Sequence, residues 1–315
     1  MHGASFCIMS HPKKQTTIDE AIQLFNKFSR LRHSKLSTRT YLQYLANFKK
    51  FCAEQSINHV ASVTLEHCYD FAQWLEDQQY QQSTISYHMS AIRQLFNTTL
   101  SHQLTIMNPM DIPIPEYDCV AHTPMTRNDY NKMIAAMRTL PTTFKTLRDE
   151  LVIRLLFFTG MRVSELCNSR VQDLELSERY MRIKTSKKRK HYRIVGCWDN
   201  ETAYVLDQYL TMRESYTTHN YLIVNLDHRP HKKNNQITTR SIERIFIQTT
   251  KLAKIKKKLV PHSARHGWAI TMMRKNMHPR YIQTALGHSN LSTLQVYTQI
   301  FDEDIVKKLK KYSKK

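Results

Sequence analysis

The sequence predicts a mainly helical protein of the α+β class, with two domains and a small β-hairpin in the second. Apolar side chains recur at helical spacing along most of the chain. Four prolines (Pro109, Pro113, Pro115 and Pro124) would interrupt any helix between residues 109 and 124, which is typical of a linker. A length of 315 residues also suits two domains of ordinary size.

Residues 1–15 are expected to form an N-terminal extension, and residues 16–108 a domain of four amphipathic helices. The four apolar stripes are Ile18, Ile22, Phe25 and Phe28; Tyr41, Leu45, Phe48 and Phe51; Leu65, Cys68, Phe71 and Leu75; and Ile85, Met89, Ile92, Leu95 and Phe96. Because the aromatic residues lie on these stripes, we expect them in the core and not stacked on nucleotide bases. Ser83 is the expected N-cap of the fourth helix.

After the linker (residues 109–124), a second domain is expected over residues 125–301, followed by a helical tail (residues 302–315). Thr126 and Asp129 predict a capped helix through Met137, and an apolar helix should run from about Thr143 to Phe158. Strand-like runs over 180–184 and 191–196 flank the basic segment 185–190, which predicts a hairpin. The remainder is expected to be helical. In the tail, one stripe holds the apolar residues Ile305, Val306, Leu309 and Tyr312.

Basic charge is concentrated in the second part of the chain. The protein has 47 Lys and Arg against 26 Asp and Glu, giving a net charge of +21. Residues 1–120 hold ten of each sign, so the excess lies in residues 121–315. Within the neutral part, residues 11–53 are basic and residues 54–120 are acidic. This pattern indicates a polyanionic partner such as nucleic acid. Ribosomal and membrane-surface proteins share such a charge, so charge alone does not identify the partner.

Other classes of site find no support in the sequence. Six cysteines are scattered without a CxxC pair, which predicts neither a zinc site nor a disulfide framework. No apolar run is long enough for a membrane span, and residues 1–14 lack the apolar core of a signal peptide. We therefore expect a cytoplasmic protein with no metal, no cofactor and no membrane partner.

Three motifs contain the residue types needed to attack a phosphodiester. They are Thr159-Gly160-Met161-Arg162-Val163-Ser164-Glu165-Leu166, then His262-Ser263-Ala264-Arg265, and then Leu286-Gly287-His288 with Tyr297 nine residues later. A tyrosine oxygen can attack phosphorus, arginines can hold the charged oxygens, and a histidine or lysine can protonate the leaving oxygen. This chemistry needs no metal.

On these motifs the chain resembles the tyrosine recombinase (phage integrase) family over nearly its whole length. The resemblance implies that Arg162 and Arg265 clamp the phosphate, with Glu165 orienting Arg162. It also implies that His262 assists proton transfer, that His288 binds a non-bridging oxygen, and that Tyr297 is the nucleophile. Taken singly, Arg162 could be a salt-bridge partner, His262 a helix cap and Tyr297 a core aromatic. The order and spacing of all three motifs favour the resemblance.

The family also places a catalytic lysine in the β-hairpin, and here the sequence departs from the common Gly-Lys-Gly turn. Ser186-Lys187 aligns best with relatives that have a Ser-Lys-Thr turn, so Lys187 is the expected acid, with Lys184 and Lys188 as alternatives. Three basic residues of the segment 185–190 and three of the first domain are expected to contact DNA. These candidates are Lys188, Arg189, Lys190, Lys35, Arg39 and Arg93.

The resemblance implies a site-specific DNA recombinase that works through a 3′-phosphotyrosine intermediate, in integration, excision or resolution. Its helical core-binding (SAM-like) domain and its catalytic domain would form a clamp on double-stranded DNA, and the protein would act as a homotetramer on paired recombination sites. Two alternatives remain open at this point. One is a type IB topoisomerase, in which lysine tends to stand at the position of His262. The other is a catalytically silent architectural DNA-binding protein.

Overall fold

The structure is a computed structural model that describes residues 15–32, 34–110, 123–184, 192–226 and 236–287. The chain divides into two compact units, residues 1–120 and 121–315. Each has its own hydrophobic core. The predicted fold class, mainly helical with a small antiparallel sheet, is confirmed.

The first unit is a helical domain whose core is formed by most residues of the predicted apolar stripes, whereas Phe28 and Leu65 are only partly buried. Its helices are α1 (Ile18–Arg32), α2 (Lys35–Glu54), α3 (Leu65–Asp77) and α4 (Gln82–Ser101), with a 3₁₀ turn over Val60–Ser62. α4 packs against the other three helices. Phe48 and Phe71 are fully buried and meet edge to face, with ring centroids 5.3 Å apart. These aromatic residues are therefore core residues, as predicted.

The expected N-cap of the fourth helix is wrong. α4 begins at Gln82 after the N-cap residue Gln81, so Ser83 lies inside the helix. The Gln81 side chain makes no capping hydrogen bond, whereas the Gln82 side chain donates to Glu76 at 2.6 Å. The short turn after α3 thus sets where α4 begins, which a search for Ser, Thr, Asp or Asn at the N-cap does not detect.

A buried histidine lies in the core of the first unit. His88 of α4 is 2% exposed. Its Nδ1–H donates to the Thr84 carbonyl at 2.9 Å, and its Nε2 accepts from the Asn47 amide at 3.0 Å. Burial lowers the pKa of His88 from its ordinary value near 6.5, although the bond to Thr84 opposes this effect. The neutral ring satisfies both partners.

The second unit is built around α6, a helix that is buried on nearly all sides. The helices of this unit are α5 (Arg127–Met137), α6 (Phe144–Thr159), α7 (Val163–Asn168), α8 (Asn200–Arg213), α9 (Thr239–Leu252), α10 (Pro261–Arg274) and α11 (Pro279–Leu286). α6 packs against α5, α8, α9 and α10. Its sequence lacks a polar face, as expected for a helix at the centre of a core.

Helix caps confirm two of the predicted boundaries in this unit. Thr126 and Asp129 form a capping box at the start of α5, with the Thr126 hydroxyl 2.6 Å from the carboxylate. Thr143 caps α6, and Gly160 ends it in the left-handed conformation. The Lys257 ammonium also pairs with Asp129, at 2.5 Å.

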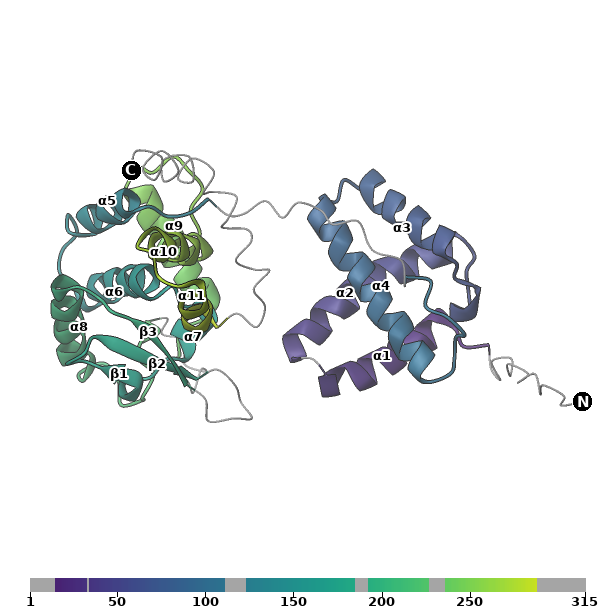
Figure 1. Cartoon of the computed structure of the whole chain (residues 1–315), viewed down its shortest axis with the longest axis horizontal. Helices are drawn as coiled ribbons and strands as arrows, with labels where there is room; N and C mark the ends of the chain where they lie inside the picture. The colour runs from purple at the N-terminus through teal and green to yellow at the C-terminus, as the bar shows by residue number, and fades with distance from the viewer. Residues whose placement is uncertain (1–14, 33, 111–122, 185–191, 227–235, 288–315) are drawn as a thin grey trace, which may run out of the picture. The chain divides into compact units, whose positions relative to one another are not determined.

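The sheet of the second unit has three antiparallel strands in the order β1-β2-β3 (Figure 1). β2 (Tyr180–Lys184) and β3 (Tyr192–Gly196) form the predicted hairpin, with Lys184 opposite Tyr192. β1 (Leu174–Glu175) is too short for a period-two pattern to reveal it. The expectation that the remainder is helical is wrong after α8, because Tyr221 forms an isolated bridge with Arg170 and Val224 forms one with Gln236.

Candidate functional site

Arg162 lies at the junction between two helices, where it is the N-cap residue of α7. The chain leaves α6 through Gly160, and Arg162 has extended backbone dihedral angles. The Arg162 N–H donates to Glu165 Oε2 at 2.7 Å, and its guanidinium donates to Glu165 Oε1 at 3.0 Å. The side chain remains 39% exposed. The local sequence therefore presents this guanidinium at the surface with its direction set by Glu165.

Glu165 is held between two arginines. Besides Arg162, the Arg193 guanidinium donates to Glu165 Oε2 at 2.6 Å. Burial by itself raises the pKa of Glu165. The hydrogen bonds from Arg193 and from the Arg162 backbone, with the charges of both arginines, outweigh burial and lower the pKa overall. The carboxylate stays ionised and can orient both guanidinium groups.

Arg265 and His262 lie one turn apart on α10, so they share one face of that helix. Arg265 is 2% exposed, and it donates to the Gly160 carbonyl at 2.8 Å and to the Leu286 carbonyl at 2.7 Å. His262 is exposed, and its ring lies 5.0 Å from that of His266 between centroids. The second motif thus reaches both the end of α6 and the end of α11.

The C-terminal end of α11 is held by three arginines from three different elements. Ala285 O accepts from Arg193 at 2.8 Å, and Gly287 O accepts from Arg162 at 3.1 Å. Leu286 O accepts from Arg265. The last carbonyls of a helix lack partners within it and carry partial negative charge, which guanidinium groups satisfy. The three sequence motifs therefore meet at the residues that directly precede His288.

Two glycines permit this close approach. Other helices of the chain end on left-handed residues with side chains, such as Ser56, Gln79 and Asn276. The left-handed conformation alone therefore does not explain the glycines at 160 and 287. A Cβ on Gly160 would lie 2.9 Å from the Trp268 ring, and one on Gly287 would lie 3.0 Å from the Arg193 guanidinium. Glycine at these two positions leaves room for the Trp268 ring beside the end of α6 and for the Arg193 guanidinium beside the end of α11.

Sequence reasoning missed Arg193. Strand alternation contains a signal for it, because Arg193 and Val195 share the buried face of β3 while Tyr192 and Ile194 are exposed. An arginine on the face of a strand that also presents a buried valine needs a partner inside the protein.

Several predicted site residues lie outside the described part of the chain: Lys187, Lys188, Arg189, Lys190, His288, Tyr297 and the tail. The alternative lysine, Lys184, is exposed at the end of β2. In the first unit, Lys35 and Arg39 are exposed on the first turns of α2. Arg93 is half-buried and donates to the Met110 carbonyl at 2.9 Å, so part of its guanidinium holds α4 to the residues that follow it.

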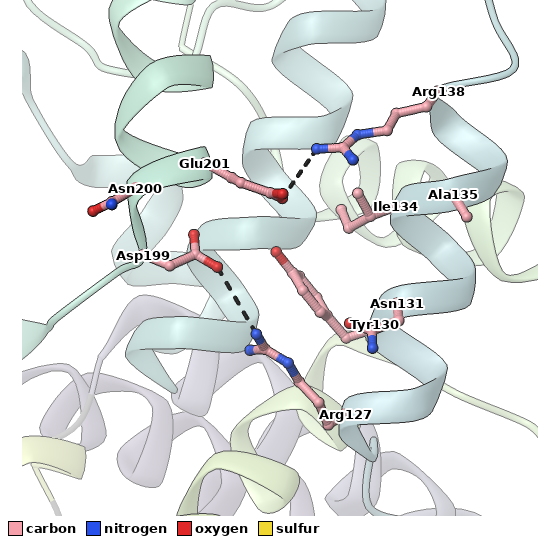
Figure 2. Close-up of a pocket in the computed structure, with 9 residues that line it drawn as sticks. All are labelled: Arg127, Tyr130, Asn131, Ile134, Ala135, Arg138, Asp199, Asn200 and Glu201. Carbon is pink, nitrogen blue, oxygen red and sulfur yellow. Dashed lines mark hydrogen bonds and ion pairs between the residues drawn. The ribbon is translucent and has the colours of Figure 1, made fainter.

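A surface pocket of about 820 Å³ lies between α5 and the start of α8. Figure 2 shows that its charged side chains face one another. Arg138 pairs with Glu201 at 3.0 Å, and Arg127 approaches Asp199 at 3.9 Å. Beneath them Arg154, which is fully buried, donates two hydrogen bonds to Glu150. Of the predicted site residues that the structure describes, none lines this pocket.

Among the residues that the structure describes, no group of three or more His, Cys, Asp or Glu side chains is placed to hold a metal ion. Among those same residues, no helix has the length and apolar character needed to cross a membrane.

Comparison with known proteins identifies the family. The sequence profile described as "Phage integrase family" matches residues 124–304, and the one described as "Phage integrase, N-terminal SAM-like domain" matches residues 22–103. The first match covers more than half of the chain. The chain therefore belongs to the phage integrase family, and the predicted family is confirmed.

Relatives and solved structures agree with this assignment. The chain is 28% identical over 277 residues to a tyrosine recombinase of Pseudothermotoga lettingae, covering 86% of this chain and 90% of the relative. A crystal structure of XerH site-specific recombinase bound to palindromic difH substrate has a similar fold, with a TM-score of 0.77, 17% identity, and coverage of 97% of this chain and 100% of that chain. A lambda integrase tetramer bound to a Holliday junction has a TM-score of 0.66 and 14% identity, covering 89% of this chain and 76% of that one.

Proposed function

We propose that this chain is a site-specific DNA recombinase that cleaves and rejoins DNA through a 3′-phosphotyrosine intermediate. One observation carries the proposal. Arg162 and Arg265, which belong to different sequence motifs, donate to the adjacent carbonyls of Gly287 and Leu286. The next residue is His288, and Tyr297 follows nine residues later. The fold thus gathers two motifs at the start of the third.

The two arginines differ in what they can offer to a phosphate. Arg162 is partly exposed, and its planar guanidinium is oriented by Glu165, so it can bind two non-bridging oxygens of a scissile phosphate. Arg265 is buried against the ends of α6 and α11. We infer that Arg265 supplies positive charge from below the phosphate while it holds the two helix ends together. Both charges would stabilise the five-coordinate transition state.

The remaining roles complete the reaction. Tyr297 would attack phosphorus in line, and the bond to the 5′-oxygen would break as Lys187 protonates that oxygen. His262 would assist the proton transfer, and His288 would hold a non-bridging oxygen. Reversal of these steps by a 5′-hydroxyl of another strand rejoins the DNA. Because the phosphotyrosine bond retains the energy of the broken bond, rejoining needs no nucleotide cofactor.

The assembly on DNA is also part of the proposal. We infer that the two units clamp double-stranded DNA and that four copies pair two sites, as in the Holliday-junction complex of lambda integrase. Lys35 and Arg39 are exposed on α2, where they could meet phosphates. The apolar stripe of the tail would dock on a neighbouring copy. Deleting residues 303–315 should then impair tetramer assembly in sedimentation more than binding to a single site.

Trapping of covalent complexes tests the function. A library of nicked duplexes with random central sequence is incubated with the wild-type protein and with Tyr297→Phe, and covalently bound DNA is recovered and sequenced. The wild-type protein should yield adducts at a defined site, whereas Tyr297→Phe should bind that site within a few-fold and yield none. The absence of adducts with the wild-type protein would favour an architectural binding protein. On a supercoiled plasmid that carries the recovered site, relaxation without recombinant products would favour a topoisomerase.

A further inference from the structure

Arg193 is a buried guanidinium that joins three elements of the candidate site. It lies on β3 and is 6% exposed. Its Nε donates to Ala285 O at the end of α11 at 2.8 Å, and one terminal nitrogen donates to Glu165 Oε2 on α7 at 2.6 Å. The other terminal nitrogen lies 3.0 Å from where a Cβ on Gly287 would be. A single side chain from β3 thus contacts both α7 and α11.

The strand register places the Arg193 side chain on the buried face of the sheet, where a charged group is energetically unfavourable. On β3 the buried positions are Arg193 and Val195, whereas Ile194 is 59% exposed. Arg193 pairs across the sheet with Ile183, which is also buried. An apolar side chain at position 193 would match these neighbours, and burying a guanidinium is unfavourable unless it is fully paired. The contacts to Glu165 and Ala285 therefore indicate a role other than core packing.

The contacts of Arg193 form a closed ring with Arg162. Arg193 holds Glu165, and Glu165 holds Arg162 through both its oxygens. Arg193 also holds Ala285 on α11, while Arg162 donates to Gly287 just beyond the end of that helix. Arg193 therefore fixes both groups between which the Arg162 guanidinium is placed. A shift of either group would shift that guanidinium.

We propose that Arg193 is a positioning residue for DNA cleavage, which sets the Arg162 guanidinium against the scissile phosphate through Glu165 and the end of α11. This inference rests on the proposed recombinase function. Arg193 itself is too buried to be the phosphate contact. Among the described residues, loss of Arg193 would leave Arg162 as the charged partner of Glu165, which could then draw that guanidinium away from the phosphate. A misplacement of about 1 Å at a reacting centre costs roughly 10²-fold in rate.

The test compares two substrates that differ in their need for Arg162. Both are nicked duplexes that carry the site recovered by trapping with the wild-type protein. One has an ordinary scissile phosphodiester, and the other has a methylphosphonate, in which a methyl group replaces one non-bridging oxygen and removes the negative charge. A guanidinium that neutralises this charge contributes much less to cleavage of the methylphosphonate. Single-turnover cleavage is measured at saturating protein, so that changes in binding do not enter.

Arg193→Met keeps the length of the side chain and removes its donors, and Arg193→Lys keeps the charge but cannot serve both partners in the same way. We expect Arg193→Met to lose roughly 10²-fold on the phosphodiester and much less on the methylphosphonate, as Arg162→Ala should. Arg193→Lys should fall between Met and wild type. Adding Arg193→Met to Arg162→Ala should cause little further loss, because both changes act through one group.

Arg182→Met is the matched control. Arg182 lies on the neighbouring strand β2 and also pairs with a carboxylate, that of Glu175 at 3.4 Å, but it is 54% exposed. The Arg182→Met variant should cleave both substrates at the wild-type rate.

Two results would overturn the proposal. One is wild-type cleavage of the phosphodiester by Arg193→Met. The other is an equal loss on both substrates, which would show that Arg193 supports the fold in general and not Arg162. If Arg193→Met does not fold, as judged by its circular dichroism spectrum, the same comparison of substrates is made with Arg193→Lys and with Glu165→Gln. Failure of the recombinase function itself is a separate outcome, because the wild-type protein would then form no adduct.

Discussion

Arg162 and Arg265 should both be needed for cleavage, but their loss should affect stability very differently. Arg265→Ala removes the donors to the carbonyls of Gly160 and Leu286, and Arg265 is 2% exposed. A buried acceptor left without a partner costs about 1–3 kcal/mol. With two such acceptors, the free energy of unfolding of the second unit should fall by roughly 2–6 kcal/mol.

Arg162→Ala should be much milder in its effect on stability. The Arg162 side chain is 39% exposed, and its acceptor Gly287 O belongs to an exposed residue that water can reach. Arg162→Ala also removes the ion pair with Glu165, and ion pairs that involve an exposed side chain contribute about 0–1 kcal/mol. Both variants should nevertheless lose roughly 10² or more in the rate of cleavage, because each removes a preorganised positive charge.

The assay must follow the second unit alone. The chain has three tryptophans, of which Trp198 and Trp268 are buried in the second unit and Trp74 lies in the first. In a Trp74→Phe background, urea unfolding followed by fluorescence therefore reports on the second unit. Cleavage of the nicked substrate is measured on the same proteins, at a temperature where each is folded.

Two outcomes would refute this reasoning. Equal stability of the two alanine variants would show that Arg265 does not satisfy buried carbonyls. Near wild-type cleavage by Arg162→Ala, with weakened binding, would show that Arg162 only docks DNA. Arg265→Lys is an informative third variant, because it keeps the charge but offers donors from a single nitrogen. It should recover part of the stability and little of the cleavage.

Three further predictions follow from other parts of the chain. Because burial lowers the pKa of His88, the unfolded chain binds a proton near pH 6.5 more readily than the folded first unit does, so this unit should lose stability as pH falls below about 6.5. In urea titrations between about pH 5 and 7, His88→Gln should reduce this dependence of stability on pH. An unchanged pH dependence in that variant would assign the effect to another titratable group. Arg154→Ala should destabilise the second unit by about 3–5 kcal/mol, because Glu150 loses its buried partner, whereas the exposed Arg127→Ala near the same pocket should cost about 1 kcal/mol or less in the same denaturation experiment. If Lys187 is the acid, Lys187→Ala should lose roughly 10²–10⁴ in cleavage rate and recover on a substrate with sulfur as the bridging leaving atom, and rescue of Lys184→Ala instead would move the role to that lysine.

Local patterns in the sequence predicted the four helices of the first unit, α5, α6 and the hairpin, but neither β1 nor the bridges formed by Tyr221 and Val224. Helical periodicity identified the four helices of the first unit, because an amphipathic helix buries one stripe whatever its partners are. The capping box of Thr126 and Asp129 identified the start of α5, because its hydrogen bonds join residues only three apart. Ser83 shows the limit of this reasoning, since its suitability as a cap was outweighed by the turn that precedes α4.

The sequence by itself determined the family of this protein and the residue types of its candidate site, because each motif is a short run whose order and spacing can be read directly. Only the tertiary structure decided that Arg162, Arg193 and Arg265 meet at the end of α11. It also decided that Arg265 is buried while Arg162 is partly exposed. These properties depend on contacts between residues that lie far apart in the chain. The packing of α6, α7, α10, α11 and β3 against one another sets whether each guanidinium is buried and which carbonyl it contacts. No local sequence pattern contains that information.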